Sequence, residues 1–276
     1  ATSMKVGSVW NPGNVVGPMI TNGNDKLLKA LELEQGESWL VPPQFLDKNK
    51  YVLAPTVKWG VRPGSYSFRT ELFGPMLSVV CIENLQQGIE LVNSLDYGLT
   101  SGLQSLDEEE QRLWKNSIMA GNLYINRGIT GAIVNRQPFG GMKLSAFGGG
   151  VKAGGPNYCA CFVKISDKPG STTDYKQSYP KAYEQEFAHA RDINNLYGEQ
   201  NVFRYLPLRN MVLRLFPGDT NEDAQMIAFA AKICHTPLTI SFEPGDDRTT
   251  ALASLGCSLK KESLQEFLKS MSEYER

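Results

Sequence analysis

The sequence predicts an α/β fold in two parts. Between residues 76 and 126, strand-like and helix-like segments alternate in the order strand, helix, strand, helix, strand. This is the pattern of parallel strands joined by crossover helices. A shorter alternation of the same kind begins near residue 211. The chain of 276 residues is 41% hydrophobic and 21% charged, a composition that supports a substantial buried core.

The first part of the chain supplies these elements in order. Residues 24–34 place leucines near the helical period, and two prolines at 42–43 would end any helix before them. Residues 76–82 are apolar and partly β-branched, as expected of a buried strand. The remaining expected segments are a helix at 84–94, a strand at 100–105, a helix at 107–120 with an acidic first turn, and a strand at 122–126.

Residues 128–156 are rich in glycine and are expected to be irregular. Glycines let the backbone approach a ligand or another segment closely, although a flexible surface loop would have the same composition. In residues 158–165 small or apolar side chains alternate, which predicts a strand that pairs with a second subunit in a homo-oligomer. Cys159 and Cys161 are then small residues on that strand.

A smaller unit follows a segment at 167–178 that is rich in proline, glycine, serine, threonine and lysine, a composition typical of a boundary. Its expected elements are a helix at 182–196, a strand at 211–216, a helix at 221–233, a strand at 238–242 and a helix at 259–271. We therefore divide the chain into a first domain at 1–166, a linker at 167–180 and a smaller α/β domain at 181–276.

Charge and cysteine content exclude several classes of function. The formal net charge is −1, so no long-range field favours nucleic acid or an anionic membrane. No apolar run approaches the ~20 residues that a membrane-spanning helix needs. Five scattered cysteines and two histidines predict reduced thiols in the cytoplasm, with neither a disulfide framework nor a metal site. Cys81 lies in an apolar segment and is expected to be an inert, buried thiol.

Four short motifs follow one another along the chain. They are Thr-Glu-Leu-Phe-Gly-Pro at 70–75, Gly-Asn-Leu-Tyr-Ile-Asn at 121–126, Gln-Pro-Phe-Gly-Gly at 137–141 and Lys-Ala-Gly-Gly-Pro at 152–156. Together they resemble the C-terminal part of the aldehyde dehydrogenase superfamily, over residues 5–165. The run Gly-Ala-Ile-Val-Asn-Arg-Gln-Pro-Phe-Gly-Gly at 131–141 narrows the resemblance to the 1-pyrroline-5-carboxylate (L-glutamate-γ-semialdehyde) dehydrogenases. The resemblance implies an aldehyde-dehydrogenase-like catalytic-domain fragment and NAD-dependent oxidation of L-glutamate γ-semialdehyde to L-glutamate in proline catabolism.

Glu71 and Phe73 are the residues that the resemblance assigns to the cofactor. A carboxylate accepts two hydrogen bonds at once, so it suits the vicinal hydroxyls of a ribose. In this family the corresponding glutamate contacts the nicotinamide ribose of NAD, and the aromatic residue packs beside it. Without the surrounding motifs, a solvated glutamate and a core phenylalanine before a strand would be the better explanation.

Gly131, Ala132 and Phe139 are assigned to the substrate by the same resemblance. Consecutive backbone N–H groups in a glycine-containing turn bind anions without a charged side chain, and the resemblance implies that Gly131 and Ala132 anchor the amino-acid end of the semialdehyde. Phe139 matches the aromatic residue that lines the aldehyde tunnel, where an apolar wall excludes water. A turn without a ligand and plain core packing are the alternatives. Asn126, at the end of a strand, is given a turn or positioning role.

The family reaction also needs residues that this sequence lacks. It uses a cysteine nucleophile that usually follows Gly-Gln, a glutamate base and an asparagine oxyanion donor, and no Gly-Gln-x-Cys occurs in the 276 residues. Residues 5–20 resemble a region that the family places after its nucleophile. We therefore assign no catalytic residue here, expect the nucleophile and the dinucleotide-binding sheet upstream, and expect the isolated chain to be inactive.

The smaller unit carries a weaker resemblance. Residues 198–207 are similar to the start of an aldehyde dehydrogenase cofactor domain, but Phe-Pro-Gly-Asp stands at 216–219 in place of a Pro-Trp-Asn stretch. This resembles the catalytically silent domain of some bifunctional proline-utilization flavoproteins, which implies a fused proline dehydrogenase domain. Two alternatives stay open: a non-enzymatic scaffold or assembly module with this fold, and an enzyme for another aldehyde.

Overall fold

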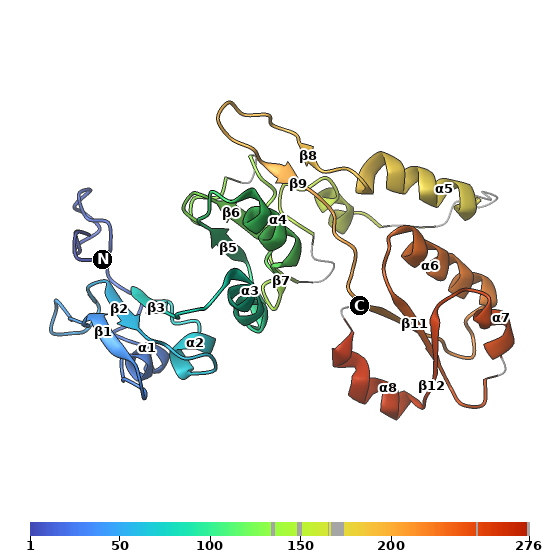
Figure 1. Ribbon diagram of the computed structural model, residues 1–276, viewed down its shortest axis with the longest axis horizontal. Coiled ribbons are helices and arrows are strands. Elements are labelled where there is room, and N and C mark those ends of the chain that lie inside the picture. Colours follow the sequence, from blue (N-terminus) through green and yellow to red (C-terminus); the bar gives the residue numbers. More distant parts are fainter. Residues whose placement is uncertain (134–135, 148–150, 165, 167–173, 247, 275–276) are drawn as a thin grey trace. The chain divides into compact units, whose positions relative to one another are not determined.

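The computed structural model describes residues 1–133, 136–147, 151–164, 166, 174–246 and 248–274. Their contacts divide the chain into two compact units. The first unit comprises Ala1–Gly131 and Phe139–Lys152, and the second comprises Ala132–Pro138 and Ala153–Arg276 (Figure 1). Helices and strands alternate in both units, so the predicted α/β class is confirmed.

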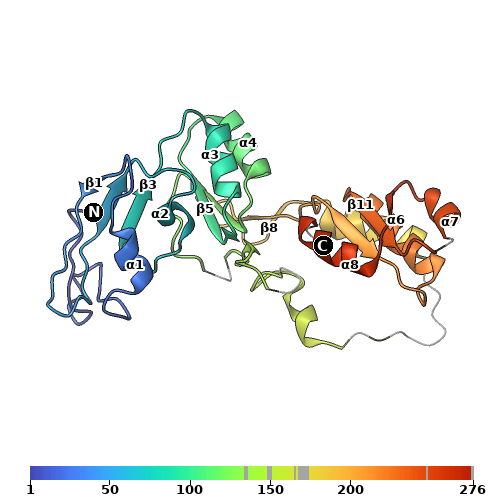
Figure 2. The ribbon, with the colours of Figure 1, turned by 90° about the horizontal axis from the view of Figure 1, so that it is seen from below.

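Among the described residues, a sheet of three strands opens the first unit. Strand β2 (Thr56–Trp59) is central, antiparallel to β1 (Ser38–Val41) and parallel to β3 (Met76–Val79). Helices α1 (Asp25–Ala30) and α2 (Tyr66–Arg69) belong to the same part of the unit (Figure 2). The buried apolar residues of this part are Leu27, Ala30, Leu53 and Leu72.

Two parallel strands and two helices form the next part of the first unit. Strand β5 (Thr100–Leu103) pairs with β6 (Asn122–Ile125), and the chain between them forms α4 (Glu108–Ser117). Helix α3 (Leu85–Asn93) packs beside α4 (Figure 2). The buried core here consists of Ile89, Trp114 and Ile118. The predicted order of strand, helix, strand, helix and strand is therefore confirmed.

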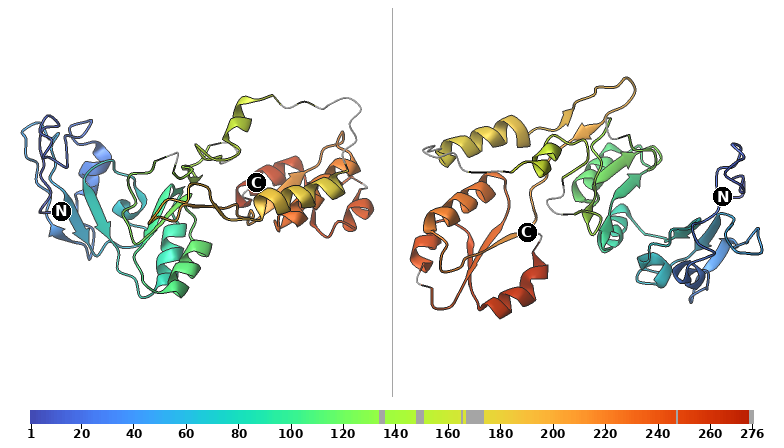
Figure 3. Two further views of the ribbon diagram at one scale, coloured as in Figure 1. Left: turned by 90° about the horizontal axis from the view of Figure 1, so that it is seen from above. Right: turned by 180° about the vertical axis from the view of Figure 1, so that it is seen from behind.

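The second unit is built on a parallel sheet, with β10 (Met211–Arg214), β11 (Leu238–Phe242) and β12 (Ser258–Lys261) in that order. Helices α6 (Asn221–Ile233) and α7 (Thr249–Ala253) cover one face (Figure 3). The core on that face consists of Leu215, Ala224, Ala228, Ala231, Leu238, Ile240, Phe242 and Leu252.

The opposite face of this sheet meets helix α8 (Leu264–Ser270). Side chains alternate between the two faces along a strand, so Arg214 and its partner Ser241 point away from the α6 side. The ring of Phe267 lies 5.5 Å from the Arg214 guanidinium. The sheet is thus covered on both faces, as is usual for parallel sheets.

Short elements complete the chain. Helix α5 (Tyr175–Ala182) continues into the π-helical turn η2 (Tyr183–Phe187). Strand β8 (Arg191–Asp192) pairs antiparallel with β9 (Val202–Phe203). A 3-10 turn, η3 (Met271–Glu273), follows α8.

Residues 158–164 do not form the expected strand. Tyr158–Phe162 is a 3-10 turn, η1, in which Tyr158 N donates to Gly155 O and Ala160 N to Asn157 O. These bonds between residues three apart close the backbone locally, which prevents an extended conformation. Cys159 and Cys161 are exposed on the turn. The predicted strand is wrong, and subunit pairing through it loses its basis.

Two expected helices of the second unit also lie elsewhere. The helix expected at 182–196 begins at Tyr175, because the Asp174 side chain caps it by accepting from Lys176 N at 2.9 Å, and its last turn ends at Phe187. The first residues of the helix expected at 259–271 belong to β12, and α8 begins only at Leu264, where a capping box joins Ser263 and Glu266.

The remaining expectations concern Cys81 and the linker. Cys81 lies beyond the end of β3 and is exposed, so its predicted burial is wrong. Residues 167–173 of the expected linker lie outside the described residues, and the boundary at 167–180 stays a prediction.

Candidate cofactor and substrate site

Glu71 and Phe73 project outward from the segment between α2 and β3. Leu72, between them, is buried in the core, whereas both of these side chains are exposed. Phe73 is 79% exposed with a φ of 49°, a conformation that residues other than glycine adopt rarely. The explanation of Phe73 as a core residue is therefore wrong. Among the described residues, none forms a hydrogen bond or ion pair with the Glu71 carboxylate.

The loop that carries Glu71 is held from α1. The Asn24 side chain accepts from Leu27 N at 2.8 Å and donates from Nδ2 to Leu72 O at 3.4 Å. A Cβ atom on Gly74 would lie 2.9 Å from Leu27 Cδ2, so glycine allows the loop to approach the core this closely. The exposed carboxylate and ring are thus mounted on a fixed backbone.

Gly131 and Ala132 lie in an irregular segment after β6. Gly131 has a φ of 83°, which favours glycine. Within the described part of the chain, no oxygen accepts a hydrogen bond from the backbone N–H of Gly131 or Ala132. As far as the described residues go, these amides are left for an external acceptor, as the anchor prediction requires. Gly131 belongs to the first unit and Ala132 to the second.

Asn126 fixes the end of the strand that precedes this segment. Its φ is 56°. Its Oδ1 accepts from Ser105 N and its Nδ2 donates to Ser105 O, each at 2.9 Å. The side chain thus pairs with both backbone groups of a residue just after β5, which ties the ends of two neighbouring strands together.

Phe139 is half-buried and directly precedes the Gly140-Gly141 pair. With Phe139 the chain belongs again to the first unit, in which β7 (Met142–Lys143) pairs antiparallel with β4 (Tyr97–Gly98). Phe139 therefore lies on a segment anchored by backbone pairing only three residues later.

Lys152 is a further residue of this region that the sequence did not single out. Its Nζ donates to Gly140 O at 2.9 Å, to Asn122 Oδ1 at 3.4 Å and to Gly121 O. Burial lowers the pKa of Lys152 from 10.5 to about 8. Both Lys152 and Asn122 stand inside motifs of the sequence, but nothing in the motifs shows that they meet.

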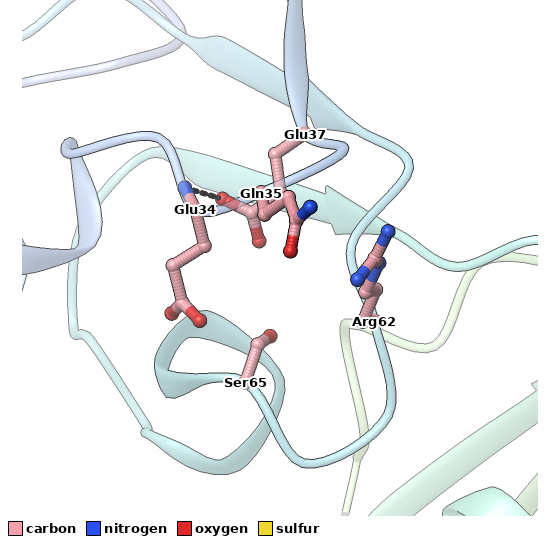
Figure 4. Close-up of a pocket in the computed structure, with 5 residues that line it drawn as sticks. All are labelled: Glu34, Gln35, Glu37, Arg62 and Ser65. Carbon is pink, nitrogen blue, oxygen red and sulfur yellow. Dashed lines mark hydrogen bonds between the residues drawn. The ribbon is translucent and has the colours of Figure 1, made fainter.

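A polar cavity of about 200 Å³ lies elsewhere in the first unit and is lined by Glu34, Gln35, Glu37, Arg62 and Ser65 (Figure 4). None of the residues assigned from the sequence lines it. It is smaller than the roughly 300–1,000 Å³ of typical ligand pockets. We therefore do not assign the substrate to it.

The carboxylates of this cavity already have internal partners. Glu37 is paired with the buried Lys58, whose Nζ lies 2.9 Å from Glu37 Oε2, and Glu34 Oε1 accepts from Tyr66 N at 2.9 Å. Burial acts to raise the pKa of Glu37, but the hydrogen bond from Glu34 N and the pairing with Lys58 lower it overall. The carboxylates of Glu34 and Glu37, which precede β1, therefore hold the start of β1 to β2 and α2.

No described thiol has the surroundings of an activated nucleophile. Cys81, Cys159, Cys161 and Cys234 are exposed, and Cys257 is half-buried. Burial of the sulfur raises the pKa of both Cys234 and Cys257, which disfavours the thiolate. Groups of histidine, cysteine, aspartate and glutamate that could hold a metal ion are absent among the described residues. No helix in the described part of the chain is long and apolar enough to cross a membrane.

Comparison with known proteins identifies a family and several relatives of the chain. Residues 1–167 match the aldehyde dehydrogenase family. Over 151 residues the chain is 35% identical to 1-pyrroline-5-carboxylate dehydrogenase 2 of Bacillus subtilis, which covers 54% of this chain and 29% of that protein. The chain thus spans less than a third of the length of that curated relative.

Two solved structures resemble different lengths of the chain. Proline utilization A from Corynebacterium freiburgense matches with a TM-score of 0.78 at 35% identity, over 95% of this chain and 30% of that chain. 1-Pyrroline-5-carboxylate dehydrogenase from Thermus with bound NAD matches with a TM-score of 0.53 at 34% identity, over 59% of this chain and 32% of that chain.

Proposed function

The chain belongs to the aldehyde dehydrogenase family, and from this premise we propose that it is part of an NAD-dependent enzyme that oxidises L-glutamate γ-semialdehyde to L-glutamate in proline catabolism. The observation that carries the substrate assignment is the segment at Gly131 and Ala132, whose backbone amides have no acceptor among the described residues. Relatives at about a third identity are named for the same substrate, which supports the assignment.

Glu71 and Phe73 fit the nicotinamide ribose end of NAD. The exposed carboxylate, which has no partner in the described residues, can accept from two vicinal hydroxyls at once. Phe73, at 79% exposed, offers an aromatic face beside it. NAD supplies the hydride acceptor for the reaction, and these two residues would hold it at its reactive end.

Gly131, Ala132 and Phe139 would orient the substrate. The two amides would donate to the α-carboxylate, which places the negative charge without requiring a buried cation. Phe139 would line the path of the aliphatic chain and exclude water from the aldehyde. Because these residues position rather than react, we propose that the nucleophilic cysteine, the base and the dinucleotide-binding sheet come from other parts of the complete protein.

The second unit supports a proline-utilization type of parent. The similarity to proline utilization A covers 95% of the chain, whereas that to the Thermus dehydrogenase covers 59%. We propose that the complete protein also carries a proline dehydrogenase domain and acts in the cytoplasm, and that the second unit is a catalytically silent relative of a cofactor domain.

The test uses the complete protein that contains this chain. We expect NADH formation with L-glutamate γ-semialdehyde and NAD, at a kcat/KM at least about tenfold above that for propanal, because propanal lacks the carboxylate. Absence of turnover with every aldehyde would favour the alternative of a non-enzymatic scaffold. Preference for an aldehyde without a carboxylate would be consistent with an aldehyde dehydrogenase but would exclude L-glutamate γ-semialdehyde as its substrate.

A further inference from the structure

Two backbone segments of the first unit touch beside Lys152. Gly121 directly precedes β6, and Gly140 follows Phe139. A Cβ atom on Gly121 would lie 1.9 Å from Gly140 O and 2.7 Å from Gly141 Cα. No side chain fits there, so the segments meet through their backbones alone.

This contact gathers oxygen atoms, and Lys152 supplies the donors that they need. Its Nζ donates to Gly140 O at 2.9 Å, to Asn122 Oδ1 at 3.4 Å and to Gly121 O. Asn122 Nδ2 donates to the same Gly140 O and to Leu99 O, each at 3.0 Å. The three hydrogens of an ammonium group match the three acceptors.

We propose that Lys152 is a positioning residue for the substrate tunnel, an inference that rests on the proposed function. Gly140 is covalently joined to Phe139, so holding the Gly140 carbonyl sets the backbone orientation of the tunnel wall. Gly121 leads into β6, the strand that runs on toward Gly131. One ammonium group therefore ties the wall of the tunnel to the strand that precedes the anchor loop. A displacement of about 1 Å in such a site lowers the reaction rate by roughly 100-fold.

Lys143 offers a matched control from the same loop. Its Nζ also donates to two backbone carbonyls, Asn93 O and Leu95 O, each at 2.6 Å. These carbonyls lie at the end of α3 and just beyond it, and none of the residues assigned to substrate or cofactor is among them. Substitution of Lys143 therefore removes a lysine that binds backbone carbonyls but leaves the hydrogen bond between Lys152 and Gly140 in place.

The first measurement is hydrogen–deuterium exchange of the 276-residue chain. Both Lys152→Met and Lys143→Met remove the ammonium group and keep a long side chain. In Lys152→Met, exchange at the Gly121 and Asn122 amides should rise at least about tenfold, because opening of this contact costs less. In Lys143→Met it should stay near that of the unchanged chain. Exchange in Lys152→Met equal to that of the unchanged chain would overturn the proposed link, whatever reaction the protein catalyses.

The second measurement is steady-state kinetics of the complete protein. Lys152→Met should raise the KM for L-glutamate γ-semialdehyde about tenfold, with a smaller change in the KM for NAD and no such effect in Lys143→Met. Raised exchange with both kcat and KM for the semialdehyde unchanged would overturn the positioning role. If the unchanged enzyme oxidises no semialdehyde, the proposed function fails instead, and the exchange experiment still decides whether Lys152 ties the two segments.

A second variant covers the case in which Lys152→Met does not fold. Lys152→Arg keeps a charged donor on a long stem, so protection of Gly121 and Asn122 should be largely retained. Loss of that protection in a folded Lys152→Arg variant would contradict the link.

Discussion

At Glu71 the feature that matters is an exposed carboxylate beside a buried neighbour, Leu72. We predict that Glu71→Ala in the complete protein raises the KM for NAD by roughly 10- to 100-fold, since a hydrogen bond to a charged group contributes about 1.5–3 kcal/mol. Glu83→Ala removes another exposed carboxylate of the same unit and should leave this KM unchanged. An equal KM for NAD in both variants would contradict the assignment of Glu71 to the cofactor site.

Substitutions of Ala132 test whether its segment binds the carboxylate of the substrate. Ala132→Asp would set a carboxylate against that of the substrate, so the KM for L-glutamate γ-semialdehyde should rise roughly tenfold or more, equivalent to about 1.4 kcal/mol or more. The KM for propanal should change little. Ala132→Ser, which adds a hydroxyl without charge, should keep a KM near that of the unchanged enzyme. If Ala132→Asp leaves the semialdehyde KM unaltered, these amides do not bind the carboxylate.

The lowered pKa of Lys152 leads to a prediction of how the free energy of unfolding depends on pH. Burial lowers its pKa from 10.5 to about 8 in the folded chain, so below pH 8 the charged form carries a desolvation cost. Between the two values the unfolded chain binds more protons than the folded one, and the contribution of Lys152 to the free energy of unfolding therefore rises with pH. Urea unfolding at about pH 7 and about pH 9.5 should show this rise in the unchanged chain and a smaller one in Lys152→Met. If the free energy of unfolding depends on pH equally in the two chains, the lowered pKa of Lys152 would be contradicted.

Motifs indicated which residues could touch ligands, but not what holds them. Glu71, Gly131 and Phe139 are predicted because each occupies a fixed place in a short sequence motif. The partners of Lys152 lie 12 and 31 positions earlier in the chain, and no local pattern links residues so far apart. Tertiary hydrogen bonds of this kind become visible only when the backbone path is known.

At the scale of elements, the predictions held where periodicity and end signals agreed. The helix expected at 221–233 and the strand expected at 238–242 match α6 and β11 in both bounds. The Thr220 capping box fixes the start of α6, and in β11 the apolar residues Leu238, Ile240 and Phe242 alternate with polar ones. The segment at 158–164 failed because alternation predicts a strand only where the backbone has a partner. Here glycine, proline and asparagine close a local turn first.

The contact between the start of β6 and the glycine-rich loop gives a prediction at this scale. Gly121→Ala would place a methyl group 1.9 Å from Gly140 O, so the free energy of unfolding should fall by at least about 2 kcal/mol. Gly128→Ala adds the same methyl group where nothing lies within 4 Å, and a change within about 0.5 kcal/mol is expected. Denaturant unfolding of the two variants makes the comparison. Equal stability would mean that the two segments do not touch.

At the scale of the whole molecule, the parallel sheet of the second unit is the one to compare with a dinucleotide-binding sheet. Parallel sheets bind dinucleotides at the carboxyl ends of their strands. In the second unit this edge carries Arg214, whose guanidinium donates to Ser241 Oγ at 2.9 Å, to Glu262 O at 2.8 Å and to the Glu243 carboxylate. Lys260 and Glu262 form a further ion pair beside it, at 2.8 Å. Among the described residues of this edge, Arg214 and Lys260 are thus each paired with a carboxylate, which leaves neither of these two cations for a pyrophosphate.

The isolated 276-residue chain should therefore oxidise no aldehyde and bind NAD weakly or not at all. It has no Gly-Gln-x-Cys sequence, and in the proposed site Glu71 alone would hold only one end of the cofactor. We expect no NADH from the chain with L-glutamate γ-semialdehyde, and an NAD dissociation constant of about 1 mM or weaker, equivalent to about −4.1 kcal/mol. Absorbance and calorimetry measure the two quantities, with the complete protein as the control. NAD-dependent turnover by the chain alone would mean that a described thiol is activated in spite of its surroundings.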